Sequence, residues 1–259
     1  MTSGHRRRHS LLLPGWIVIV AALAGCQPPQ EAAAPGASAP RDFSGTWLPD
    51  SRRATPWPDS LPLTPMARSF MESFDAAAAD PTSFCMPLGT PRNMLQTELP
   101  LEIVQTPERL VMVLQPNLAN AEVRRIHLDG RPLPEAPDPS WFGTSRGRWE
   151  GSTLIIETVG LRPDAIISGD GLPHSAQLRV IERLTLADDA ESGKVLINDI
   201  ELHDPQAYLA PLKARRYFAW APHARLQESV CAERRWIDKL WRDRLREHAE
   251  AARQTKGAR

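Results

Sequence analysis

The sequence predicts a mainly β protein in which an antiparallel meander of about 8–10 strands closes into a barrel. From about residue 100 onward, short runs rich in β-branched and apolar residues alternate with turn residues. No helical crossover separates these runs, so consecutive strands are expected to pair as hairpins. A long meander removes its exposed edges by closing on itself, which favours a barrel over an open sheet.

The composition agrees with a folded domain and excludes two classes of protein. Of the 259 residues, 42% are hydrophobic and 24% are charged, which is too apolar for a disordered chain. Lys and Arg number 31, as do Asp and Glu, so there is no basic field for a nucleic acid. Nucleic-acid binding is therefore not expected.

The first 26 residues have the pattern of an export signal. Arg6, Arg7 and Arg8 form a cationic start, and an apolar run from Leu11 to Leu23 follows. Pro14 and Gly15 interrupt this run, which is shorter than the roughly 20 apolar residues of a spanning helix. The rest of the chain is therefore expected outside the cytoplasm.

The signal ends in Leu23-Ala24-Gly25-Cys26, which resembles the lipobox of bacterial lipoprotein precursors. The resemblance implies cleavage after residue 25 and lipidation of Cys26. The expected partner is then a membrane, to which the lipid anchors the protein. Gln27, rather than aspartate, follows the cysteine, and by the same resemblance this favours the periplasmic face of the outer membrane. An uncleaved anchor helix is the alternative.

Beyond the signal, the chain is expected to divide into three parts. Residues 26–42 are rich in proline and alanine and lack a hydrophobic period, which predicts a disordered tether. Residues 43–232 form the barrel domain. Residues 233–259 form a C-terminal amphipathic helix and tail.

Two cysteines remain once Cys26 is assigned to the lipid. In an oxidising compartment the pair Cys85 and Cys231 predicts a disulfide. Two buried free thiols are the alternative, and no CxxC or CxxH spacing suggests zinc.

The folded region opens with Ser44-Gly45-Thr46-Trp47. This resembles the Gly-x-Trp start of lipocalins, in which the tryptophan closes the bottom of the barrel, and it implies a lipocalin-like shape. The matching arginine on a late strand would be Arg215 or Arg216.

A helix is predicted from Thr64-Pro65, which supply a capping threonine and a proline at the first helical position. Met66, Phe70 and Phe74 follow at four-residue spacing and form an apolar stripe. The helix should fade in 76–79 and stop at Asp80-Pro81.

The predicted strands follow in three clear hairpins and three single runs. They are Leu101–Gln105, Arg109–Leu114, Ala121–Leu128, Arg146–Trp149, Thr153–Val159, Gln177–Leu186, Lys194–Leu202, Lys213–Trp220 and Arg225–Cys231.

The C-terminal stretch from Ala232 to Arg259 is expected to be helical, with Ile237, Leu240, Trp241 and Leu245 on one face. Two interpretations remain open. The basic helix contacts an anionic membrane surface, or its apolar face packs on the barrel wall.

The densest group of polar and aromatic residues lies between His127 and Glu182. The run Gly147-Arg148-Trp149-Glu150-Gly151 is followed by His174-Ser175 and Glu182-Arg183. This pattern resembles a widespread, largely uncharacterised family of exported bacterial proteins, over about residues 43–232. The resemblance implies no reaction, and Thr144 and Ser152 depart from the pattern.

The candidate ligand-binding residues come from this run. A polar cluster is expected to orient a small, mostly apolar ligand, and aromatic side chains are expected to line its pocket. The candidates are Trp141, Arg148, Trp149, Glu157, His174, Ser175 and Glu182.

Each candidate also has a purely structural interpretation. A strand glutamate often pairs with arginine on the solvent face, and the aromatic residues fit core packing. His174 beside Asp170 is the candidate for acid–base catalysis, because a nearby carboxylate orients an imidazole. His174 as an ordinary hydrogen-bonding loop residue is the alternative.

Three functions follow. The first is a lipid-anchored envelope protein whose barrel binds a small apolar ligand. The second is a structural or interaction lipoprotein, and the third is a cofactor-free hydrolase, lyase or isomerase that uses His174. The sequence favours a protein that is not an enzyme. It has no HxH or HExxH metal motif, no P-loop and no dinucleotide fingerprint, so no metal and no cofactor is expected.

Overall fold

The computed structural model describes residues 41–253, apart from 56, 59, 97, 116–120, 228–230, 232–237, 240 and 249–252. The predicted signal peptide, Cys26 and the tether up to residue 40 lie outside the described residues.

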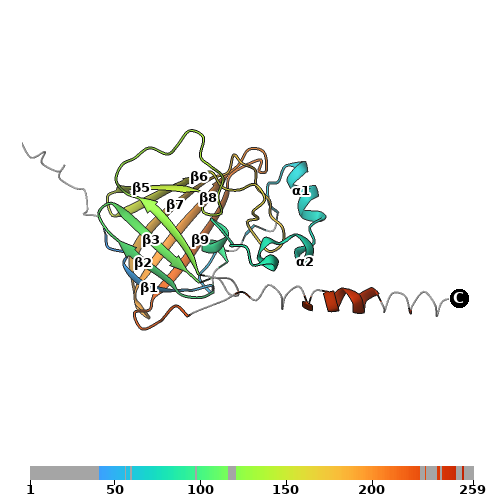
Figure 1. The fold of residues 1–259 in the computed structure, drawn as a ribbon. Helices are drawn as coiled ribbons and strands as arrows, with labels where there is room; N and C mark the ends of the chain where they lie inside the picture. Colours follow the sequence, from blue (N-terminus) through green and yellow to red (C-terminus); the bar gives the residue numbers. More distant parts are fainter. Residues whose placement is uncertain are drawn as a thin grey trace, which may run out of the picture. The chain divides into compact units, whose positions relative to one another are not determined.

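The described part of the chain forms a closed nine-stranded barrel (Figure 1). The strands follow each other around the barrel in chain order, and β1 pairs with β9 to close it. The predicted mainly β barrel is therefore confirmed. The strands are β1 (Gly45–Pro49), β2 (Leu101–Gln105), β3 (Arg109–Leu114), β4 (Glu122–His127), β5 (Thr144–Glu150), β6 (Thr153–Val159), β7 (Arg179–Asp189), β8 (Gly193–His203) and β9 (Leu212–Trp220).

One strand pair departs from the predicted hairpins. β4 and β5 run parallel and share only two register pairs, Ile126 with Ser145 and His127 with Arg146. The proline-rich connection 128–143 is long enough to return the chain before β5 starts, which a hairpin turn is not. The other neighbouring pairs are antiparallel, as predicted.

The prediction of a last strand at Arg225–Cys231 is wrong for those of its residues that the structure describes. Residues 225–227 and 231 have no strand conformation. β9 already has β8 on one side and β1 on the other, so no edge is left for a further strand.

Four short helical segments precede β2, and two of them, α1 and α2, lie to one side of the barrel (Figure 1). Thr64 caps α1 by accepting a hydrogen bond from the Ala67 amide, and a proline starts the helix, as predicted. The segments are α1 (Pro65–Glu72), α2 (Ala76–Ala79), the 3₁₀ helix η1 (Pro81–Phe84) and α3 (Arg92–Leu95).

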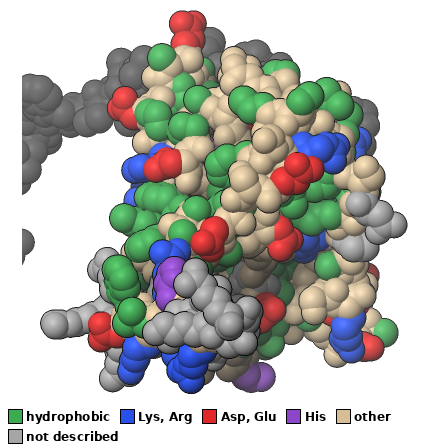
Figure 2. All heavy atoms as spheres, turned by 90° about the vertical axis from the view of Figure 1, so that its right-hand side faces the viewer, with side chains coloured by type: hydrophobic (Ala, Val, Ile, Leu, Met, Phe, Trp, Pro, Cys, Tyr) green, Lys and Arg blue, Asp and Glu red, His purple; other side chains and the backbone are tan. Residues whose placement is uncertain are grey.

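The apolar stripe of α1 is largely exposed. Met66 is 63% and Phe70 46% exposed, whereas Ala67 is buried, so the helix packs through its small residue. Figure 2 looks onto the side of the molecule that carries these helices, where hydrophobic side chains are spread among acidic ones.

One end of the barrel is closed by aromatic side chains. Trp47 is fully buried, its indole nitrogen donates to the Phe43 carbonyl at 2.9 Å, and its ring meets that of Trp220 edge-on at 4.9 Å. Phe43 in turn stacks on Trp149 at 5.5 Å. Gly45 has a φ of 125°, and a Cβ there would lie 2.2 Å from the Trp220 ring, so only glycine fits.

The cation over these rings is Lys194, at 3.7 Å from the ring centre of Trp220 and 5.3 Å from that of Trp47. Neither arginine expected from the lipocalin resemblance has this position. Arg215 pairs with Asp199 on the outer face, and Arg216 donates to the carbonyl of Leu95.

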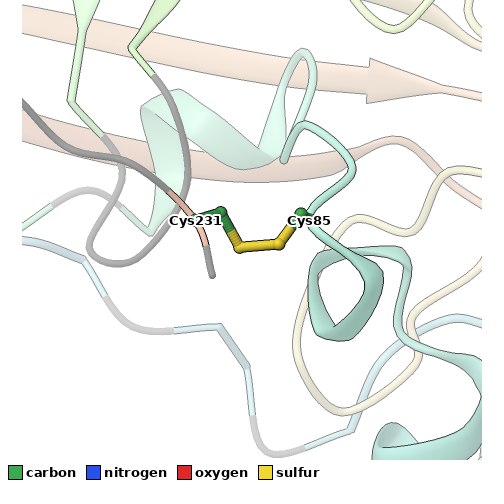
Figure 3. The surroundings of a disulfide bond; sticks show 2 residues. All are labelled: Cys85 and Cys231. Carbon is green, nitrogen blue, oxygen red and sulfur yellow. A yellow bond between two sulfur atoms is a disulfide. The ribbon is translucent and has the colours of Figure 1, made fainter. Parts of the chain in front are cut away.

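The structure contains the expected disulfide between Cys85 and Cys231 (Figure 3). It joins the residue after η1 to a point beyond β9, with a separation of 146 residues along the sequence.

In the C-terminal region, residues 238–239 and 241–248 are helical. Trp241 and Leu245 are each 62% exposed. Ile237 and Leu240 of the predicted apolar face lie outside the described residues. In the described part of the chain, no helix is both long and apolar enough to cross a membrane.

Candidate functional site

The barrel encloses a polar cluster at its centre. The Arg124 guanidinium pairs with the Glu182 carboxylate, and neither side chain has any exposed surface. The Asn198 amide donates to the other Glu182 oxygen at 2.9 Å. Alternation along β4, β7 and β8 turns these three side chains inward.

Two hydroxyl groups complete this inner cluster. Arg124 Nη2 donates to Thr158 Oγ1 at 2.9 Å and lies 3.4 Å from Ser145 Oγ, and the two hydroxyl oxygens are 2.8 Å apart. Nε and Nη1 of Arg124 and Oδ1 of Asn198 have no hydrogen-bond partner in the described part of the chain. The cluster is packed on all sides, so its first role is to hold five strands of the barrel in register.

An accessible site lies where β1 leaves the barrel wall. A cleft of about 300 Å³ opens between the segment that follows β1, the end of α3 and the middle of β9. We call it the Arg216 cleft. It is lined by Pro49, Asp50, Ser51, Ala54, Met94, Leu95, Gln96, Glu98, Arg216, Tyr217 and Phe218.

Two buried contacts fix the α3 wall of this cleft. Arg92 forms a bidentate ion pair with Asp80, at 2.9 and 2.8 Å. Burial by itself would raise the pKa of Asp80, but the Arg92 guanidinium holds that pKa below its usual value. Asn93 Nδ2 contacts Glu122 Oε2 at 3.1 Å, which ties α3 to β4.

Glu122 also accepts the Leu88 amide at 2.5 Å. Burial raises the pKa of Glu122, and the amide groups of Leu88 and Asn93 that donate to its oxygens oppose this shift. The loop before α3 is thus attached to the barrel through groups that face away from solvent.

The structure separates the two glutamates of the predicted site. Glu182 lies inside the barrel, whereas Glu157 lies on the outer face, where it pairs with Arg146 at 2.9 Å and with Arg179. Arg148 is also outside and pairs with Glu150. The period of two along β6 and β7 places Glu157 and Glu182 on opposite faces.

His174 is buried in the loop before β7, and its Nδ1 lies 2.9 Å from the Ser175 carbonyl oxygen. A carbonyl only accepts, so Nδ1 carries the proton, and Nε2 has no partner among the described residues. Burial lowers the pKa of His174, which favours the neutral ring.

The Ser175 hydroxyl donates to Asp204 at 2.8 Å rather than to His174. Asp170, the expected partner of His174, is exposed. The described hydrogen bonds of His174 therefore include no carboxylate.

The two tryptophans predicted to line the ligand pocket lie in different parts of the structure. Trp149 packs against the core at the closed end of the barrel. Trp141 lies in the connection before β5, where the Arg162 guanidinium covers its ring at 4.9 Å. Neither of them lines the Arg216 cleft.

Sequence reasoning missed the residues that form the cleft and, apart from Glu182, those of the inner cluster. Arg124 and Ile126 share one face of β4, so the apolar character of Ile126 was a signal that Arg124 faces inward. Met94 and Leu95 had no such signal, because α3 is one turn long. In the described part of the chain, no three His, Cys, Asp or Glu side chains are grouped so that they could hold a metal ion.

Comparison with known proteins found no significant match to a family model, to a curated protein or to a solved structure.

Proposed function

We propose that this chain is a lipid-anchored cell-envelope protein whose barrel domain binds a small, mostly apolar molecule in the Arg216 cleft. The observation that carries the ligand-binding proposal is the cleft itself. It combines apolar surface from Pro49, Ala54 and Leu95 with one half-buried guanidinium. Small-molecule sites have this composition, a mostly apolar lining with a few polar groups that set orientation.

The cleft is small but sufficient for such a ligand. Its volume of about 300 Å³ is at the lower end of the range for ligand pockets.

The proposed test fills the cleft. Ala54 lines it and is only half-buried, so Ala54→Trp is expected to occupy the space without disturbing the core. We expect at least a tenfold loss of affinity for N-phenyl-1-naphthylamine, a neutral fluorescent probe, in a fluorescence titration. The protein used is the Cys26→Ala chain, purified without detergent.

The matched control is Ala176→Trp, which adds the same ring at an exposed alanine outside the cleft lining. Unchanged probe affinity in Ala54→Trp, or an equal loss in Ala176→Trp, would contradict binding in the cleft. Native mass spectrometry of protein purified from its own host then identifies a molecule that copurifies.

The membrane anchor has its own test. Cys26→Ala removes the thiol that the lipid would modify, and without acyl chains the domain has no durable attachment to the bilayer. We expect the variant to move from the membrane fraction to the soluble periplasmic fraction, as measured by fractionation and immunoblotting. Full recovery of the variant in the membrane fraction would mean that Cys26 is not the main anchor.

A second candidate function is that of an interaction lipoprotein of the envelope. The exposed apolar side chains Met66 and Phe70 on α1 and Leu209, which is 72% exposed, favour it. Leu209 is close to the start of α1, since its amide donates to the Pro62 carbonyl at 2.7 Å. Loss of partner binding in Phe70→Ser, with ligand binding intact, would support this function.

A further inference from the structure

Arg216 is held in the cleft by neutral groups. Nε donates to the Leu95 carbonyl at 3.0 Å, and Nη1 donates to the carbonyls of Thr55 and Arg215 at 2.9 and 3.0 Å. These contacts fix the plane of the guanidinium without neutralising its charge. In the described part of the chain, Arg216 forms no ion pair, and its Nη2 donates to no group.

This arrangement differs from that of the other half-buried and buried arginines of the domain. Arg92 and Arg124 each face a carboxylate. Burial lowers the pKa of Arg216, which means that the surroundings disfavour its charge. An anion brought to Nη2 would relieve this penalty, because charge-assisted hydrogen bonds are stronger than those between neutral groups.

Two carboxylates line the cleft, and neither forms an ion pair with Arg216 among the described residues. Asp50 is engaged by Arg52 and Arg53, at 3.1 and 2.9 Å. Glu98 lines the cleft and is exposed to solvent. Asp50 is thus compensated by its own arginines.

The rest of the lining sets what is attached to the anion. Pro49, Ala54 and Leu95 give the cleft apolar surface, whereas Met94 and Phe218 are almost fully buried and expose little of theirs. A ligand that satisfies both parts has a charged end and an apolar body. A chain of about eight carbons with a terminal carboxylate has both parts.

We propose that the ligand of the Arg216 cleft is a small amphipathic carboxylate whose carboxylate pairs with Arg216 and whose apolar chain packs on Pro49, Ala54 and Leu95. This inference rests on the proposed function, since it names the chemical class of the molecule bound in the same cleft. Arg216 acts as the specificity-determining residue, because its charge selects the anion over an alcohol of equal length.

The test compares octanoate with 1-octanol, which has the same chain and no charge. Isothermal titration of the Cys26→Ala chain at pH 7.5 is expected to give at least a tenfold higher affinity for octanoate. Raising the salt concentration is expected to weaken octanoate binding and to leave octanol binding unchanged.

Arg216→Met should make the two affinities equal while the affinity for octanol stays the same. The matched control is Arg215→Met, the neighbouring arginine on the outer face, which pairs with Asp199 and should keep the preference. If the methionine variant does not fold, Arg216→Lys is the substitute, because it keeps the charge but not the planar donor group of the guanidinium. It is expected to keep only part of the preference for octanoate over 1-octanol.

Equal affinities in the parent chain, or a preference that survives in Arg216→Met, would overturn the inference while leaving the apolar site in place. If neither octanoate nor octanol binds, the proposed function itself fails, and the inference fails with it.

Discussion

Glu182→Gln is expected to lower the free energy of unfolding by about 3–5 kcal/mol, because it leaves the Arg124 charge without a counter-ion at the centre of the barrel. Both side chains are fully buried, so water cannot replace the lost carboxylate. The measurement is urea denaturation followed by tryptophan fluorescence at pH 7.5.

Glu157→Gln is the matched control. Glu157 is on the neighbouring strand but faces outward, and its partners Arg146 and Arg179 are about half exposed. Its loss is expected to cost about 0–1 kcal/mol, as is usual for surface ion pairs. Equal effects of the two substitutions would contradict the placement of Glu182 inside the barrel.

The double variant Arg124→Met/Glu182→Leu removes both charges at once. Replacing a buried ion pair by apolar residues is often neutral or stabilising, so this variant should recover most of the stability that Glu182→Gln loses. The Asn198 amide would then lack its acceptor, which is why complete recovery is not expected.

The second large effect is expected from the disulfide. Cys85→Ala/Cys231→Ala should lower the free energy of unfolding by up to about 5 kcal/mol, since the bond closes a loop of 146 residues in the unfolded chain. Melting curves recorded with and without dithiothreitol provide the measurement. The parent chain should melt at a lower temperature under reducing conditions, and the double variant should melt at the same temperature in both.

Cys26→Ala serves as the control for the thiol chemistry, because it leaves Cys85 and Cys231 intact. Its melting temperature should respond to dithiothreitol as the parent chain does. If dithiothreitol does not change the melting temperature of the parent chain, the result would contradict a stabilising bond between Cys85 and Cys231.

Much of the fold follows from local patterns in the sequence. Alternating residues and turn dipeptides predicted the strands from Leu101–Gln105 to Lys213–Trp220, and the capping threonine predicted α1. The parallel pairing of β4 with β5 did not follow, because direction depends on where the connection 128–143 leads the chain. Arg225–Cys231 resembled a strand by composition, but its described residues, 225–227 and 231, are not in a strand, and the pairing of β9 with β1 leaves no free edge beside β9.

The site was less predictable than the fold. Glu157 and Glu182 were both candidates for the ligand site, but only Glu182 faces the interior. Its partner Arg124 was not recognised, since β4 carries two adjacent arginines and only one faces inward. The Arg216 cleft combines segments that are more than 100 residues apart, from Pro49 to Phe218. The spacing of residues in the sequence does not predict that these segments come together, because their proximity depends on the tertiary contact between α3 and β9.

The single parallel pair has a consequence for how the ring of strands is completed. If all neighbours alternated in direction, the first and ninth strands would point the same way, and an odd number of strands could not be joined by an antiparallel pair. One parallel step at β4 and β5 shifts the alternation by one, so that β1 and β9 point in opposite directions and meet antiparallel. The parity of the barrel is thus set by the connection 128–143, far from the place where the barrel closes.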